Sequence, residues 1–121
     1  MRWLSILLMS FAGSAWADGY DLRSGDAVLG AAHLQSFLPG RTLTFYDDGQ
    51  SHYYDDGRYT YTYANDGGTA YGYWSIGDDD AVCVAFVTGF SRCDLYVEAR
   101  GRLILLDGRG DRYPVRPWDT E

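Results

Sequence analysis

The residues Tyr59-Thr60-Tyr61-Thr62-Tyr63 alternate strictly between aromatic and β-branched polar side chains. Successive side chains of a β-strand point to opposite faces of the sheet, so this pattern predicts a strand with its three tyrosines on one face. A second aromatic run extends from Tyr71 to Ile76. In that run Tyr71 and Tyr73 are two residues apart and share a face. Both runs predict strands of a sheet that is rich in tyrosine.

Similar short runs of β-branched and aromatic residues continue on both sides, from Thr42 to Arg116. Clusters of Asp, Asn and Gly separate them, and Asp-Gly pairs favour the tight turns of antiparallel hairpins. No helical pattern lies between the runs, so we predict an antiparallel meander of seven or eight short strands that forms a small barrel or a strongly curved sheet. The expected strands lie near residues 42–47, 50–55, 58–64, 70–76, 81–87, 92–98, 102–106 and 111–116.

One helix is expected before the strands, over about residues 26–37, which makes the fold all-β with a single N-terminal helix. Ser24 or Asp26 can cap its first turn, and Pro39-Gly40 ends it. The residues expected on its buried stripe are Val28, Ala31, Ala32, Gln35 and Leu38, widened by Leu29 and Leu34.

The two cysteines, Cys83 and Cys93, predict a disulfide within one hairpin. If they lie directly opposite each other, the hairpin is symmetric about Thr88, and Gly89 suits the left-handed position of a three-residue turn. A disulfide in a loop of this length stabilises the fold by about 3 kcal/mol. A redox-active pair is less favoured, because the spacing does not resemble C-x-x-C.

The register of this hairpin leaves one question open. The first strand favours burial of the face that carries Val82, Val84 and Phe86, whereas the second favours the face that carries Leu95 and Val97. These two faces lie on opposite sides of the sheet. Either a bulge shifts one strand, or both sides of the hairpin are partly covered.

The first seventeen residues have the features of a secretory signal peptide. Arg2 supplies a positive charge, Leu4 to Phe11 form a short apolar segment, and Ala15-Trp16-Ala17 matches an A-x-A cleavage site. Cleavage after Ala17 leaves residues 18–121 as a single small β domain, secreted or periplasmic. An apolar segment this short does not form a stable membrane anchor, so no membrane span is expected after cleavage.

The chain is acidic, with a formal net charge of −7, and all ten of its basic residues are arginine. This charge disfavours nucleic acids and anionic membrane surfaces as partners. The absence of lysine from the sequence excludes catalysis through a lysine Schiff base.

Catalytic and metal-binding patterns are weak. His33 and His52 are isolated from thiolates, which disfavours zinc, and Ser51 and His52 point to opposite faces of a strand, so they do not form a nucleophile–base pair. The acidic clusters at 47–48, 55–56 and 78–80 lack the spacing of a calcium loop and are better explained as turn formers. We therefore predict no catalytic residue, no metal and no cofactor.

The tyrosines are the remaining candidates for a binding site. A tyrosine combines a flat apolar ring with a polar tip, which suits a ligand cavity, a sugar or a protein surface. The alternative interpretation is a barrel interior filled by aromatic rings. The possible binding face comprises Tyr59, Tyr61, Tyr63, Tyr71 and Tyr73.

Six short motifs between Gly40 and Arg116 are Gly40-Arg41-Thr42-Leu43, Asp56-Gly57-Arg58-Tyr59, Gly72-Tyr73-Trp74-Ser75, Val82-Cys83-Val84, Arg92-Cys93-Asp94 and Gly110-Asp111-Arg112-Tyr113. Together they resemble a group of short exported proteobacterial proteins of unknown function. The resemblance implies a fold and a compartment, and no activity comes with it.

The expected function is therefore that of a secreted or periplasmic, non-catalytic β domain. Its expected role is to bind an envelope protein as an inhibitor or accessory module. A small barrel that binds an apolar ligand or a sugar is the alternative, and an enzyme with an unrecognised site is less favoured.

Overall fold

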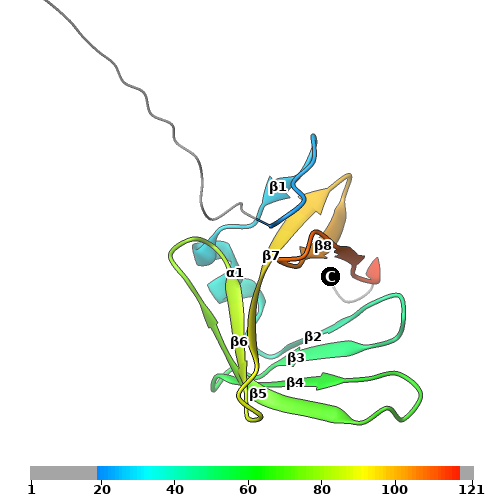
Figure 1. Ribbon diagram of the computed structural model, residues 1–121. Coiled ribbons are helices and arrows are strands. Elements are labelled where there is room, and N and C mark those ends of the chain that lie inside the picture. The colour runs from blue at the N-terminus through cyan, green and yellow to red at the C-terminus, as the bar shows by residue number, and fades with distance from the viewer. Residues whose placement is uncertain (1–18, 118–121) are drawn as a thin grey trace, which may run out of the picture.

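The computed structural model of this protein describes residues 19–117, and the predicted signal peptide at 1–17 lies outside them. Within the described residues the chain forms nine strands and one helix (Figure 1). In order they are β1 Ala27–Val28, α1 Ala31–Phe37, β2 Arg41–Thr44, β3 Gln50–Tyr53, β4 Arg58–Thr62, β5 Thr69–Ile76, β6 Val82–Phe86, β7 Ser91–Ala99, β8 Arg102–Leu106 and β9 Arg112–Pro114.

The sheet is an antiparallel meander, as predicted. Strands β2 to β9 are neighbours in sequence order, and the sheet curls into a half-barrel (Figure 1). Its two edges approach each other at one isolated bridge between Phe45 and Val115, where the Arg116 N–H also donates to the carbonyl of Thr44 at 2.8 Å. All eight predicted strands are present, and several are shorter than predicted; the first ends at Thr44 instead of residue 47.

The predicted start of the helix is wrong. Ala27 and Val28 form strand β1, which pairs with Glu98 and Val97 of β7. The cause is a long-range one, because β6 pairs with β7 only as far as Asp94, and β1 takes up the following part of the same strand.

Helix α1 consequently begins at Ala31, and neither Ser24 nor Asp26 caps it. Gly30 occupies the N-cap position without a side chain of its own. The Asp80 carboxylate, from the loop before β6, accepts a hydrogen bond from the Ala31 N–H at 2.8 Å instead. A distant residue thus satisfies a donor that local capping normally satisfies.

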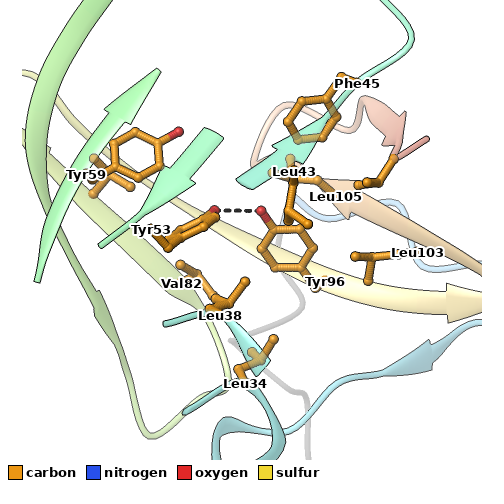
Figure 2. Close-up of a cluster of buried hydrophobic side chains, with 12 residues drawn as sticks. Leu34, Leu38, Leu43, Phe45, Tyr53, Tyr59, Val82, Tyr96, Leu103 and Leu105 are labelled. Carbon is orange, nitrogen blue, oxygen red and sulfur yellow. Dashed lines mark hydrogen bonds between the residues drawn. The ribbon is translucent and has the colours of Figure 1, made fainter. Parts of the chain in front are cut away.

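The predicted buried stripe of the helix is also wrong in part. Gln35 and Ala32 are exposed, whereas Leu34 and Leu38 are fully buried. Two leucines four residues apart lie on one side of a short helix, and Phe37 packs against the same core. They pack at one end of the half-barrel interior, and Phe45 lies at the other end (Figure 2).

The interior of the half-barrel holds the main core, which includes three buried tyrosines. The Tyr53 and Tyr96 hydroxyls are hydrogen-bonded to each other at 2.6 Å (Figure 2), and the Tyr59 hydroxyl is hydrogen-bonded to Ser51 at 2.7 Å. Each buried hydroxyl therefore has a partner. The members of this core are Leu34, Leu38, Leu43, Phe45, Tyr53, Tyr59, Val82, Val84, Tyr96, Leu103, Leu105 and Val115.

A second, smaller core lies on the outer face of β7 and β8. Because successive residues of a strand point to opposite faces, Leu95 and Val97 enter this core while Tyr96 enters the main one. The N-terminal segment covers it with Tyr20, Leu22 and Val28. Both faces of the hairpin are therefore covered, which is the second of the two arrangements that the sequence left open.

The predicted disulfide is present. Cys83 and Cys93 are directly opposite in the β6–β7 register, with Cα atoms 4.0 Å apart. The turn is the predicted three-residue one, in which the Phe86 N–H donates to the carbonyl of Phe90 at 2.8 Å. Gly89 has a φ of 97°, a left-handed conformation that favours glycine.

Candidate functional site

An open groove of about 630 Å³ lies where the ends of β4, β6, β7 and β8 converge. This end of the half-barrel is opposite to the end that α1 occupies (Figure 2). Six aromatic side chains line the groove, and five charged ones lie among them. The aromatic residues are Phe45, Tyr61, Tyr63, Phe86, Phe90 and Tyr113, and the charged residues are Asp47, Arg92, Asp94, Asp107 and Arg109.

Strand alternation brings these side chains together. On β4, Tyr59 is fully buried in the core, Tyr61 is half-buried in the groove, and Tyr63, just beyond the strand, is exposed at the groove's edge. On β7, Tyr96 lies in the core, and Asp94 and Arg92 follow it toward the groove. Alternate residues of each strand thus share the interior face, and along the strand they pass from the core to the groove and then toward solvent.

Arg92 and Asp94 form an ion pair at the base of the groove. The Arg92 Nε donates to Asp94 Oδ2 at 3.0 Å, and the guanidinium lies 5.8 Å from the ring centre of Phe86. The Arg92 side chain is 34% exposed, whereas that of Asp94 is only 4% exposed. The cation therefore faces the groove, and its carboxylate partner lies beneath it.

The environment of Asp94 is unusual for a carboxylate. Its Oδ1 atom is buried and has no hydrogen-bond partner among the described residues. Burial raises the pKa of the Asp94 carboxyl above its ordinary value, although the contact with Arg92 acts in the opposite direction. A buried carboxylate with an unpaired oxygen costs stability, and such costs are frequent at functional sites.

A second ion pair, buried and outside the groove, provides a comparison. Arg112 of β9 donates to both oxygens of Asp26 at 2.8 and 2.9 Å and to the carbonyl of Asp21 at 2.9 Å. This bidentate pair attaches the N-terminal segment to the sheet, and both Asp26 oxygens and both Arg112 Nη groups have hydrogen-bond partners. The Arg92–Asp94 pair has a single hydrogen bond, and Asp94 Oδ1 has no partner among the described residues.

The acidic side chains at the edge of the groove are turn formers. Asp107 Oδ1 accepts hydrogen bonds from the N–H groups of Arg109 and Asp111 at 3.0 and 2.9 Å. Asp47 Oδ1 accepts one from the Gly49 N–H at 2.9 Å. These bonds fix the two loops that border the groove. Burial, and after it the charge of Asp47, raise the pKa of the Tyr61 hydroxyl to about 12.

The structure does not bring the five predicted tyrosines to one face. Tyr71 pairs with Thr60 and Tyr73 pairs with Arg58, which places both on the opposite side of the sheet from Tyr61. Tyr71 and Tyr73 are 59% and 61% exposed on the outer face. Of the predicted set, Tyr61 and Tyr63 line the groove, Tyr59 belongs to the core, and the remaining two lie outside.

The sequence interpretation missed Phe86, Phe90, Arg92 and Asp94 as site residues. Alternation with Tyr96 places Asp94 and Arg92 on the interior face of β7, so part of the signal was present. The pattern does not show where along that face the core ends, because this depends on how far the other strands extend.

The two histidines lie away from the groove. His52 stacks on Tyr54 with ring centres 4.0 Å apart, and its Nδ1 is 3.0 Å from the Thr42 hydroxyl. His33 stacks on Phe37 of the same helix. Among residues 19–117, no three His, Cys, Asp or Glu side chains gather closely enough to hold a metal ion.

Within that same part of the chain, no helix has the length and apolar character needed to cross a membrane. Comparison of the sequence and the structure with protein-family models, curated proteins and solved structures finds no match.

Proposed function

We propose that this protein is a non-catalytic binding domain and that its groove receives a small amphipathic ligand. The observation that carries this proposal is the groove itself, because six aromatic side chains surround a space of about 630 Å³ above the Arg92–Asp94 ion pair. Small-molecule sites are typically concave, mostly apolar and furnished with a few well-placed polar groups. A groove of this kind offers apolar contact along its walls and one charged anchor at its base.

The outer face of the sheet supports a second candidate, the binding of an envelope protein. Tyr71, Tyr73 and Val87 are all largely exposed. They lie close together, because Tyr73 pairs with Ala85 of β6 and the Val87 N–H donates to the carbonyl of Tyr71. Exposed aromatic side chains of this kind are frequent at protein interfaces.

The proposed compartment is the periplasm or the extracellular space. The Cys83–Cys93 disulfide supports it, since such bonds persist in oxidising compartments. The leader-like residues 1–17 support it from the sequence. Mass spectrometry of the protein purified from its native cell should give the mass of residues 18–121 with both sulfurs oxidised, and a full-length mass with two thiols would contradict export.

The groove and the outer face are distinguished by a matched pair of variants. Tyr61→Ala removes a groove wall, whereas Tyr73→Ala removes an exposed ring from the outer face. Titration with phenylbutanol, followed by amide chemical shifts, should perturb residues around the groove. We expect Tyr61→Ala to weaken this binding several-fold because apolar contact area is lost, and Tyr73→Ala to leave it unchanged. Shifts confined to the β5–β6 outer face would contradict the groove as the ligand site.

A further inference from the structure

We infer that the ligand of the groove carries a carboxylate group and that the guanidinium of Arg92 binds it. This inference rests on the proposed function and adds to it the chemical class of the ligand. The body of the ligand, an apolar chain or ring, lies between the aromatic walls, while its acidic head reaches the base of the groove.

The first argument is the unused hydrogen-bonding capacity of Arg92. A guanidinium carries five N–H donors. Arg92 makes one ion-pair contact, from Nε to Asp94 at 3.0 Å, and among the described residues no second carboxylate contacts it. Arg112 uses both of its Nη groups on carboxylate and carbonyl oxygens. The Arg92 guanidinium also reaches the Tyr59 hydroxyl, and its remaining N–H donors lie beside the groove.

The second argument is accessibility. The charged group that a ligand meets at the base of the groove is Arg92, at 34% exposure, while the Asp94 carboxylate beneath it is 4% exposed. Asp107 is 13% exposed and already accepts two backbone hydrogen bonds. The guanidinium would thus repel a cationic ligand, whereas it would offer N–H donors to an anionic one.

The third argument is geometric. Carboxylates and guanidinium groups are both planar and form paired, parallel hydrogen bonds. The ring of Phe86 lies 5.8 Å from the Arg92 guanidinium, and Tyr61 lines the same groove. Such an apolar surrounding strengthens a charge-assisted hydrogen bond. The acidic charge of the whole chain opposes an anion, but that repulsion is screened beyond about 8 Å at physiological ionic strength.

The unpaired oxygen of Asp94 fits the same assignment. With Oδ1 unpaired and Oδ2 on Nε, Asp94 neutralises Arg92 from one side only. A neutral side chain at this position leaves the guanidinium with its full charge toward the groove. Asp94→Asn is therefore expected to tighten the binding of a carboxylate, whereas it would weaken the binding of a cation.

The test compares three probes that share one body and differ in their head group: phenylbutanoate, phenylbutanol and phenylbutylamine. Binding of each to the purified wild-type protein is measured by calorimetry and by amide chemical shifts. We expect phenylbutanoate to bind about tenfold more tightly than phenylbutanol, because a charge-assisted hydrogen bond is worth about one power of ten in affinity. We expect phenylbutylamine to bind most weakly.

Two arginine variants locate the contact. Arg92→Gln should remove the preference for phenylbutanoate over phenylbutanol, whereas Arg109→Gln, whose parent side chain is 83% exposed at the edge of the groove, should retain it. If Arg92→Gln fails to fold, the double variant Arg92→Gln/Asp94→Asn removes both charges of the pair and serves the same comparison. A preference that disappears in Arg109→Gln and persists in the Arg92 variants would overturn the assignment.

The outcomes separate this inference from the proposed function. If the three probes bind equally, or if the amine binds best, the inference fails while the groove remains a ligand site. If no probe perturbs the groove, the proposed function fails as well. If phenylbutanoate binds best, a short peptide that ends in phenylalanine is compared with a free and with an amidated C-terminus. Tighter binding of the free form would show that the C-terminus of a chain can supply the carboxylate, as a free organic acid does.

Discussion

At the scale of single residues, the interior of this half-barrel contains several buried hydroxyl groups. Tyr53 and Tyr96 are almost completely buried, yet their hydroxyls lie 2.6 Å apart and satisfy each other. Burial raises the pKa of both phenols above the ordinary value, because the interior disfavours the charged form. Asp94 differs, since only one of its oxygens has a partner.

The raised pKa of Asp94 predicts how stability depends on pH. Its carboxyl is surrounded by Arg92, Tyr53, Tyr59 and Asp107, and burial is the largest influence. Because the folded state binds this proton more tightly than the unfolded state, the contribution to stability is complete below pH 3.8 and is lost as the pH rises through the raised pKa.

The measurement compares wild type with Asp94→Asn by chemical denaturation between neutral pH and pH 3.8. The free energy of unfolding of the wild type should increase relative to that of the variant as the pH falls. Asp26, whose pKa is lowered chiefly by its hydrogen bond with Arg112, is unchanged in both proteins and its effect cancels. A difference that shrinks as the pH falls would contradict the assignment.

At the scale of secondary-structure elements, β5 depends on a residue with no side chain. Gly72 pairs with Tyr59 on one side and Phe86 on the other, and it is buried between them. A methyl carbon there would lie 2.6 Å from the carbonyl oxygen of Ala85. The close approach of β5 and β6 at this point therefore requires glycine.

Gly72→Ala is accordingly expected to destabilise the protein by about 1–3 kcal/mol, because neighbouring backbone must move. Gly108→Ala is the matched control, since a methyl group there meets no atom within 4 Å. Chemical denaturation of the two variants measures the difference. Equal stability of both would show that β5 and β6 separate at little cost.

The elements differ in how well the sequence predicts them, and the reason is the range of the interactions that form them. Strands β2 to β9 follow from local alternation and from turn residues between neighbours, which the sequence displays directly. Strand β1 depends on a distant partner, since Val28 pairs with Val97, so its two residues look like the start of a helix when only the local sequence is considered. The groove depends on where several strands end together, and alternation gives only the face that each residue occupies.

At the scale of the whole molecule, the N-terminal segment covers the second core, pairs with β7 through β1 and forms an ion pair with β9. Asp26 is buried, and Arg112 contacts both of its oxygens. Asp26→Ala leaves the Arg112 guanidinium without its carboxylate, and breaking a buried pair in this way costs about 3 kcal/mol.

Hydrogen exchange can show where this cost falls. Amides of β1 and of the β7 residues paired with it should lose protection, whereas those of β3 to β5 should keep more of it. Asp21→Ala, which removes the exposed pair with Arg23, is the control and should change stability by less than about 1 kcal/mol. A uniform loss of protection across the sheet would show that the segment and the half-barrel open as one unit.

The pairing of β1 with β7 also bears on the order in which the molecule assembles. A chain is made from its N-terminus, so Ala27 and Val28 are available long before Glu98 and Val97 exist. Arg112, which forms the ion pair with Asp26, is synthesised later still. Contacts between distant parts of a sequence form slowly because a long loop must close first. We therefore expect the first described segment to be synthesised to be among the last to pack, and until then Leu95 and Val97 are exposed to association with other chains.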